Sequence, residues 1–133
     1  MTTIESNKKT IAARYEDIYQ FLGDMNHFGE LMPEQIENWK SDTDSCSFRI
    51  SGMADIALKI VERVPFGKIV VSSDGKTPVS FTMVMHITAT SETTSDFQIV
   101  FLSDMNSFMA MMVTKPLTNF VNTLARKLSE YYA

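Results

Sequence analysis

The stretch from Met105 to Tyr131, MNSFMAMMVTKPLTNFVNTLARKLSEY, decides the fold that this sequence predicts. Its apolar side chains recur every three or four residues, which is the spacing of one face of an α-helix. That face consists of Leu117, Phe120, Val121, Leu124, Leu128 and Tyr131. A helix over 105–131 would be roughly 40 Å long at ~1.5 Å per residue. Pro116 lies inside it and predicts one kinked helix or two separate helices, and the continuous apolar face favours one.

The segment before this helix, from Glu34 to Asp104, has an apolar period of two. Cys46, Phe48 and Ile50 alternate with polar residues, and similar alternation recurs as far as Phe101. This pattern is typical of antiparallel strands with one buried face and one solvated face. Breaks at residues 65–67 and a turn-like segment at residues 73–76, SDGK, separate the strands. We therefore predict a meander of about six strands, whose apolar face the long helix covers.

The N-terminal part of the chain predicts three smaller elements. Residues 3–10 alternate weakly and indicate an edge strand. Residues 12–24 space their apolar side chains as a helix does, and residues 25–32 do the same until Pro33 stops them. The predicted fold class is therefore α+β, with a curved antiparallel sheet of about seven strands, two short helices and one long C-terminal helix.

Composition excludes several classes of protein. The chain has 133 residues, a formal net charge of −4 and one cysteine, so we expect a single domain over residues 1–133. The negative charge gives no electrostatic reason to expect nucleic acid or an anionic membrane surface as the main partner. One cysteine cannot form an internal disulfide, and no run approaches the ~20 apolar residues of a transmembrane segment. The N-terminus lacks the apolar stretch of a signal peptide, so the expected location is the cytoplasm.

The order of the predicted elements resembles the SRPBCC or START-like superfamily. The resemblance is carried by Thr10–Asp24, Phe28–Pro33, Ile60–Pro65 and Lys115–Leu128, and it covers essentially the whole chain. It implies the helix-grip fold, in which a curved sheet holds one long helix. The superfamily includes lipid carriers, polyketide cyclases, activators of chaperone ATPases and ring-hydroxylase domains, so the resemblance implies a fold more firmly than a function.

Motifs of catalytic chemistry are weak in this sequence. His27 and His86 fall in different predicted elements without a second ligand at metal-binding spacing, so no metal site is predicted. Cys46 falls on an apolar strand face, where a thiol usually behaves as a small hydrophobic side chain. The five glycines form no phosphate loop or dinucleotide fingerprint. The sequence therefore predicts no catalytic residue and no cofactor.

One acid–base alternative stays open at the N-terminal strand. By alternation, Glu5 and Asn7 share a face with Ile11. If Ile11 points inward, Glu5 reaches the sheet–helix space, and burial there would raise its pKa. That placement would suit a polyketide cyclase/dehydratase-like enzyme. The other interpretation is an edge strand on which both side chains are solvated.

The better-supported hypothesis is a cavity that binds a small apolar ligand. A curved sheet and a helix leave a gap where they diverge, and such gaps are common ligand sites. Methionine outnumbers leucine in this chain, and Met lines deformable binding surfaces. The predicted lining residues are Leu58, Ile60, Phe81, Met83, Met85, Phe97, Ile99, Phe101, Met109, Met112, Val113 and Phe120. The expected ligand is lipid-like, polyketide-like or quinone-like.

The turn from Ser107 to Val113 is apolar nearly all round. A helix that covers a sheet should leave one polar face. This turn is therefore either enclosed on both sides, or it forms a cavity gate, a membrane-touching patch or a homodimer contact. A contact made through this turn defines a third functional hypothesis, an interaction protein that uses the Phe108–Val113 surface.

Overall fold

The computed structural model describes residues 2–34, 36–50, 54–65, 67–74 and 80–133. Its strands form one eight-stranded antiparallel sheet, with the order β1-β8-β7-β6-β5-β4-β3 and with β2 also paired to β8. The strands are β1 (Thr2–Glu5), β2 (Lys9–Ile11), β3 (Ile36–Ser41), β4 (Ser45–Ile50), β5 (Ala54–Val64), β6 (Lys68–Ser73), β7 (Phe81–Ala89) and β8 (Ser95–Ser103). The helices are α1 (Tyr15–Leu22), α2 (Met25–Phe28), the 3-10 helix η1 (Gly29–Leu31) and α3 (Ser107–Tyr131).

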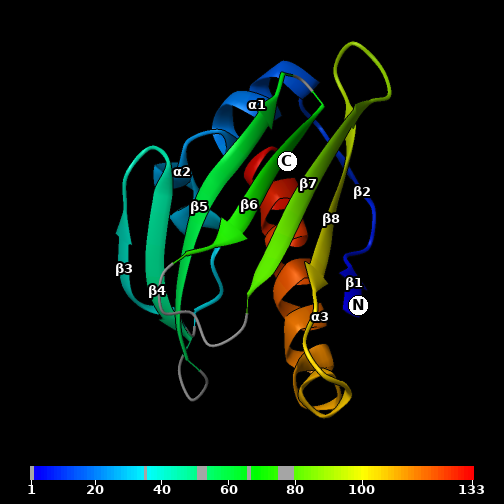
Figure 1. The fold of residues 1–133 in the computed structure, drawn as a ribbon. Coiled ribbons are helices and arrows are strands. Elements are labelled where there is room, and N and C mark those ends of the chain that lie inside the picture. Colours follow the sequence, from blue (N-terminus) through cyan, green and yellow to red (C-terminus); the bar gives the residue numbers. More distant parts are fainter. Residues whose placement is uncertain (1, 35, 51–53, 66, 75–79) are drawn as a thin grey trace.

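The predicted fold class is confirmed. Strands β3 to β8 follow one another as a meander, and the N-terminal strands return to pair with β8 at the other edge. The long helix α3 lies against one face of this sheet, and α1 and α2 lie near the C-terminal end of α3 (Figure 1). Two residues of the predicted turn, Gly75 and Lys76, and the predicted strand residue Val79 lie outside the described residues.

The predicted edge strand over residues 3–10 is two strands, because the chain changes phase after Ser6. Ile4 and Ser6 are both buried, but the next buried residue of this segment is Ile11, at an odd position. Ser6 forms two hydrogen bonds with Ile99: its N–H donates to the carbonyl oxygen, and its hydroxyl oxygen accepts from the Ile99 N–H, both at 2.9 Å. The sheet consequently has eight strands, where the sequence predicted about seven.

The two short helices form a wedge at one end of the sheet. Helix α1 buries Ile18, Phe21 and Leu22. Helix α2 begins at the N-cap Asp24, whose carboxylate accepts the Asn26 N–H at 2.9 Å. A glycine is needed after α2, since a Cβ on Gly29 would lie 2.9 Å from the indole ring of Trp39.

Helix α3 is continuous through Pro116, as the apolar periodicity predicted. The side-chain amide oxygen of Asn106 caps its N-terminus by accepting the Met109 N–H at 2.8 Å. The C-terminal half is also fastened by polar contacts. Lys127 Nζ donates to the Met32 carbonyl oxygen at 2.7 Å, and Asn122 Oδ1 accepts the Asn7 N–H at 2.7 Å.

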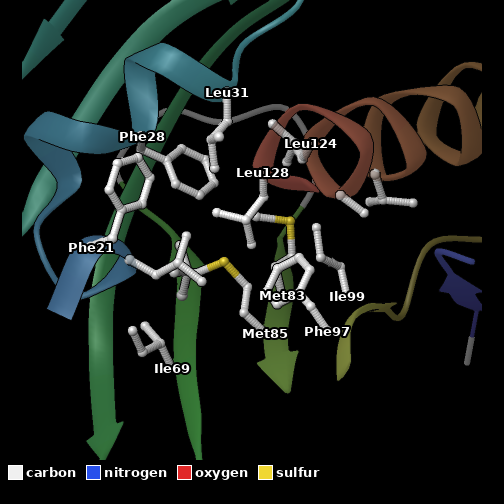
Figure 2. Close-up of a cluster of buried hydrophobic side chains, with 14 of the residues drawn as sticks. Phe21, Phe28, Leu31, Ile69, Met83, Met85, Phe97, Ile99, Leu124 and Leu128 are labelled. Carbon is white, nitrogen blue, oxygen red and sulfur yellow. The ribbon is translucent and has the colours of Figure 1, made fainter. Parts of the chain in front are cut away.

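A cluster of buried hydrophobic side chains, called the dense core below, lies between the C-terminal half of α3, the wedge and the middle of the sheet (Figure 2). Methionine and aromatic side chains of β7 and β8 meet leucines of α3 and side chains of the short helices there. The fully or almost fully buried members include Phe28, Leu31, Ile69, Met85, Phe97, Ile99, Leu124 and Leu128.

Candidate functional site

A small apolar cavity lies between the sheet and the middle of α3. Its volume is about 30 Å³. All nine lining residues are apolar: Phe48, Ile50, Ile56, Leu58, Phe81, Met83, Phe101, Leu117 and Phe120. Strands β4, β5, β7 and β8 supply the sheet side, and α3 supplies the opposite wall. This is the place where the helix and the sheet begin to diverge.

Aromatic rings form much of the cavity wall. The rings of Phe81 and Phe101 are stacked with centroids 4.8 Å apart. Phe48 bridges the two layers, because it stacks on Phe120 of α3 at 6.3 Å and on Trp39 of β3 at 5.7 Å. Such offset contacts add to the energy of burial.

The present volume is too small for a lipid-sized molecule. A single water needs ~10–15 Å³, and ligand pockets usually have volumes of ~300–1,000 Å³. The lining offers a water no polar side chain to bond to. Binding of a larger ligand therefore requires part of the wall to move.

Five of the twelve predicted lining residues line this cavity: Leu58, Phe81, Met83, Phe101 and Phe120. Three others, Met85, Phe97 and Ile99, point into the same sheet–helix layer but are packed into the dense core. Ile60 is half-buried at a bulge, where the pairing of β5 with β6 shifts register between Ile60 and Glu62.

The predicted lining residues from the first turns of α3 do not reach the cavity. Met109 and Val113 are half-buried, and Met112 is 61% exposed. These turns extend beyond the part of the sheet that α3 covers (Figure 1). Phe108 is 73% exposed and Met111 is 83% exposed, so this part of the helix is not enclosed on both sides.

Four lining residues were absent from the predicted set: Phe48, Ile50, Ile56 and Leu117. The signal that identifies them is the same periodicity. Phe48 and Ile50 alternate with polar residues on β4, and Leu117 lies one helical turn before Phe120. The sequence could not tell at which position along α3 the helix leaves the sheet, and this position selects the lining residues.

The acid–base alternative placed Glu5 and Asn7 on the inner face, and this placement is wrong. Both side chains are exposed, although Ile11 is fully buried. The change of phase after Ser6 turns Glu5 outward, where it borders an open groove on the outer face of the sheet with His86 and Gln98. The other interpretation, an edge strand on which both side chains are solvated, therefore describes where Glu5 and Asn7 lie.

The lining of the cavity includes neither His27 nor Cys46, the other two titratable candidates. His27 is exposed, stacks on Phe21 with ring centroids 4.8 Å apart, and donates through Nδ1 to the Phe21 carbonyl oxygen at 2.9 Å. Burial raises the pKa of the Cys46 thiol to about 12, and the charge of Asp42 adds to this shift. A thiol that stays protonated is a poor nucleophile. In the described part of the chain, no group of three or more His, Cys, Asp or Glu residues is arranged to hold a metal ion.

Three larger hollows are open grooves on the surface, with volumes of about 380, 380 and 450 Å³. Their borders are rich in polar and charged side chains, such as Lys40 and Asp55 in one and Arg14 and Glu16 in another. The cavity beneath α3 is smaller, but it lies between the two layers of the fold and its lining is wholly apolar. We therefore regard it as the candidate site.

Within the described residues, no helix has both the length and the apolar character that a membrane-spanning segment needs.

No family model and no curated protein sequence matches the chain. Solved structures do match it. A START superfamily protein from Mycobacterium smegmatis aligns over 98% of this chain and 96% of its own, with a TM-score of 0.74 and 12% identity. Truncated norcoclaurine synthase from Thalictrum flavum aligns over 98% and 92%, with a TM-score of 0.75 and 12% identity.

A third match is one part of the di-domain ARO/CYC protein BexL, which aligns over 96% of this chain and 46% of its own, with a TM-score of 0.68 and 11% identity. At these identities the likeness concerns the fold. The three proteins share the arrangement found here, a curved antiparallel sheet around a long C-terminal helix. The predicted resemblance is thus confirmed at the level of structure, and the chain has the helix-grip fold of the START-like proteins.

Proposed function

We propose that this protein binds a small apolar or amphipathic molecule, of lipid-like, polyketide-like or quinone-like character, between the sheet and α3. The observation that carries the proposal is the cavity itself, which is lined only by apolar side chains at the point where the two layers diverge. Ligand pockets favour such places and such linings. The START superfamily protein and the ARO/CYC protein among the matches have the same fold.

The first half of α3 is the wall that moves to admit the ligand. Among the described residues, the hydrogen bonds of this half stay within the helix or its cap, as Thr114 to Ala110 and Thr118 to Thr114 illustrate. Pro116 supplies no backbone N–H, so the helical ladder lacks one bond at this point. Residues 107–117 therefore make no hydrogen bond to the described part of the sheet that outward movement would break.

Binding is favoured over catalysis because all the lining residues are apolar. General acid–base chemistry needs a titratable group within hydrogen-bond reach of the reacting atom. Glu5, the candidate that the sequence offered, is exposed on the other face of the sheet.

The first test is native mass spectrometry of gently purified protein, followed by solvent extraction. A discrete adduct of a few hundred daltons is expected, and the extract would identify its chemical class. Protein that carries no adduct and also takes up no added fatty acid or quinone would contradict the proposal.

A pair of variants localises the binding. Ile56→Phe adds a ring to the cavity wall, so we expect it to weaken the binding of a fluorescent fatty acid about tenfold. Val84→Phe adds a ring to a half-buried strand position outside the cavity lining and should leave the affinity unchanged. Equal losses in the two folded variants would place the ligand elsewhere.

A further inference from the structure

The first turns of α3 carry an exposed apolar stripe, defined here as Phe108, Met111 and Met112. They are 73%, 83% and 61% exposed, respectively. Their spacing of three and four residues places them on one face of the helix. Lys115 extends this face, since it follows Phe108 by seven residues and is also exposed. The largest apolar patch on the surface of a monomeric protein is often a functional one.

We propose that this stripe docks on the surface of a phospholipid bilayer, with the three apolar side chains inserted among the lipids. The docking goes beyond the proposed function and does not require it. Only its use as a route for ligand entry rests on that function. Such docking differs from a membrane span, because the helix would lie in the interface with one face buried.

One exposed cation, Lys115, lies on the same helix face as the stripe and suits a phosphate-bearing surface. The other cations of α3 are engaged elsewhere, because Arg126 forms an ion pair with Glu130 and Lys127 donates to the Met32 carbonyl oxygen. Asp104, which is exposed, precedes the helix and is the nearest acidic residue in sequence. Lys115 can lay its aliphatic stem along the stripe and hold its ammonium among the headgroups. Insertion of apolar side chains is thus the main attraction, and charge assists it.

The size of the stripe favours lipid over a second copy of this chain. Three large side chains, each offering ~150–250 Å² when fully exposed, present on the order of 400 Å² here. Each partner of a standard protein interface buries about 800 Å². Binding to a bilayer needs no minimum contact area of this kind, because each inserted side chain contributes separately to the partitioning of the protein.

The stripe also adjoins the candidate cavity along the helix. Leu117 and Phe120, which line the cavity, follow Lys115 within five residues. Insertion of residues 108–112 into lipid would pull on the same half of α3 that must move to open the cavity. A ligand could then pass between bilayer and cavity without crossing water.

The test is flotation of the protein with vesicles of phosphatidylcholine, with and without added phosphatidylglycerol, and with no other ligand present. We expect the native chain to float with both. Met111→Asp should lower the partition coefficient by about tenfold or more, because it places a charge among the lipid chains. Lys115→Gln should lower the partition only for vesicles with phosphatidylglycerol, by about fivefold.

Val61→Asp is the matched control, since Val61 is another exposed apolar side chain, at 51%, on β5 instead of α3. It should float as the native chain does. Failure of the native chain to float, or equal losses from Met111→Asp and Val61→Asp, would overturn the proposal. So would self-association in analytical ultracentrifugation that Met111→Asp abolishes, combined with absence of vesicle binding.

The two proposals can fail separately. Binding of a fluorescent fatty acid by the native chain in vesicle-free solution tests the cavity, whose lining includes no residue of the stripe. Flotation tests the stripe. If the protein binds fatty acid but does not float, the ligand-binding proposal stands and the docking proposal is wrong.

Discussion

The two halves of α3 share one amphipathic pattern but meet different surroundings. In the C-terminal half, Val121, Leu124 and Leu128 are fully buried, and Lys127 joins the helix to the wedge through Met32. In the N-terminal half, Phe108 and its neighbours are exposed. The comparison indicates that the C-terminal half of α3 holds the fold together, whereas the N-terminal half leaves its apolar side chains exposed, as the two proposals require.

The largest expected contrast is in stability. Leu128→Ala should lower the free energy of unfolding by about 2–5 kcal/mol, because it empties a fully buried site in the dense core. Leu117→Ala should cost about 1 kcal/mol or less, because Leu117 is half-buried beside an existing cavity. Urea unfolding followed by circular dichroism measures both values. Similar losses at the two positions would mean that both halves of α3 contribute equally to the fold.

A second contrast concerns added volume. Met85→Phe overpacks the dense core and should lower the free energy of unfolding by about 1–3 kcal/mol. Ile56→Phe places its extra atoms beside the cavity, so its effect should stay within about 1 kcal/mol in either direction. Thermal unfolding of the two variants provides the comparison. A larger loss for Ile56→Phe would show that the cavity wall cannot yield.

The order and type of the main elements could be predicted from the sequence because they depend on local periodicity. The apolar spacing from Met105 to Tyr131 predicted one helix through Pro116, and alternation predicted the strands of the meander. The division of the N-terminal strand at Ser6 could not be predicted. It depends on the hydrogen bonds of Ser6 with Ile99, a residue far away in sequence.

The candidate site was less predictable than the fold, for a geometric reason. Periodicity tells which face of a strand is buried, and so it identified Met85 and Phe101 equally as inward-facing residues. Whether such a residue is packed in the core or lines a cavity depends on how far α3 extends over the sheet. That extent fixes Met85 in the core, Phe101 at the cavity and Met112 in solvent.

The finest probe of the comparison is thiol reactivity. Burial raises the pKa of Cys46 to about 12, so at pH 8 the folded thiol is almost wholly protonated. Because the thiolate is the reactive form, alkylation of folded Cys46 should be roughly a thousandfold slower than in denaturant.

The raised pKa of Cys46 also makes stability depend on pH. The folded state favours the neutral thiol, so the contribution of Cys46 to the free energy of unfolding is complete below pH ~8.5 and is lost as the pH rises toward 12.

A thiol placed at the cavity should behave differently. In the Cys46→Ser background, Leu117→Cys places a single thiol on the first half of α3. Among the described residues, the hydrogen bonds of this half stay within the helix or its cap. We expect the alkylation rate of this thiol at pH 8 to come within about tenfold of the unfolded rate, because outward movement of this half exposes it. Mass spectrometry of timed iodoacetamide reactions measures this rate and that of Cys46 in the native chain. If the thiol introduced by Leu117→Cys reacts as slowly as Cys46, the first half of α3 does not open, and the cavity wall that we propose to move is as rigid as the core.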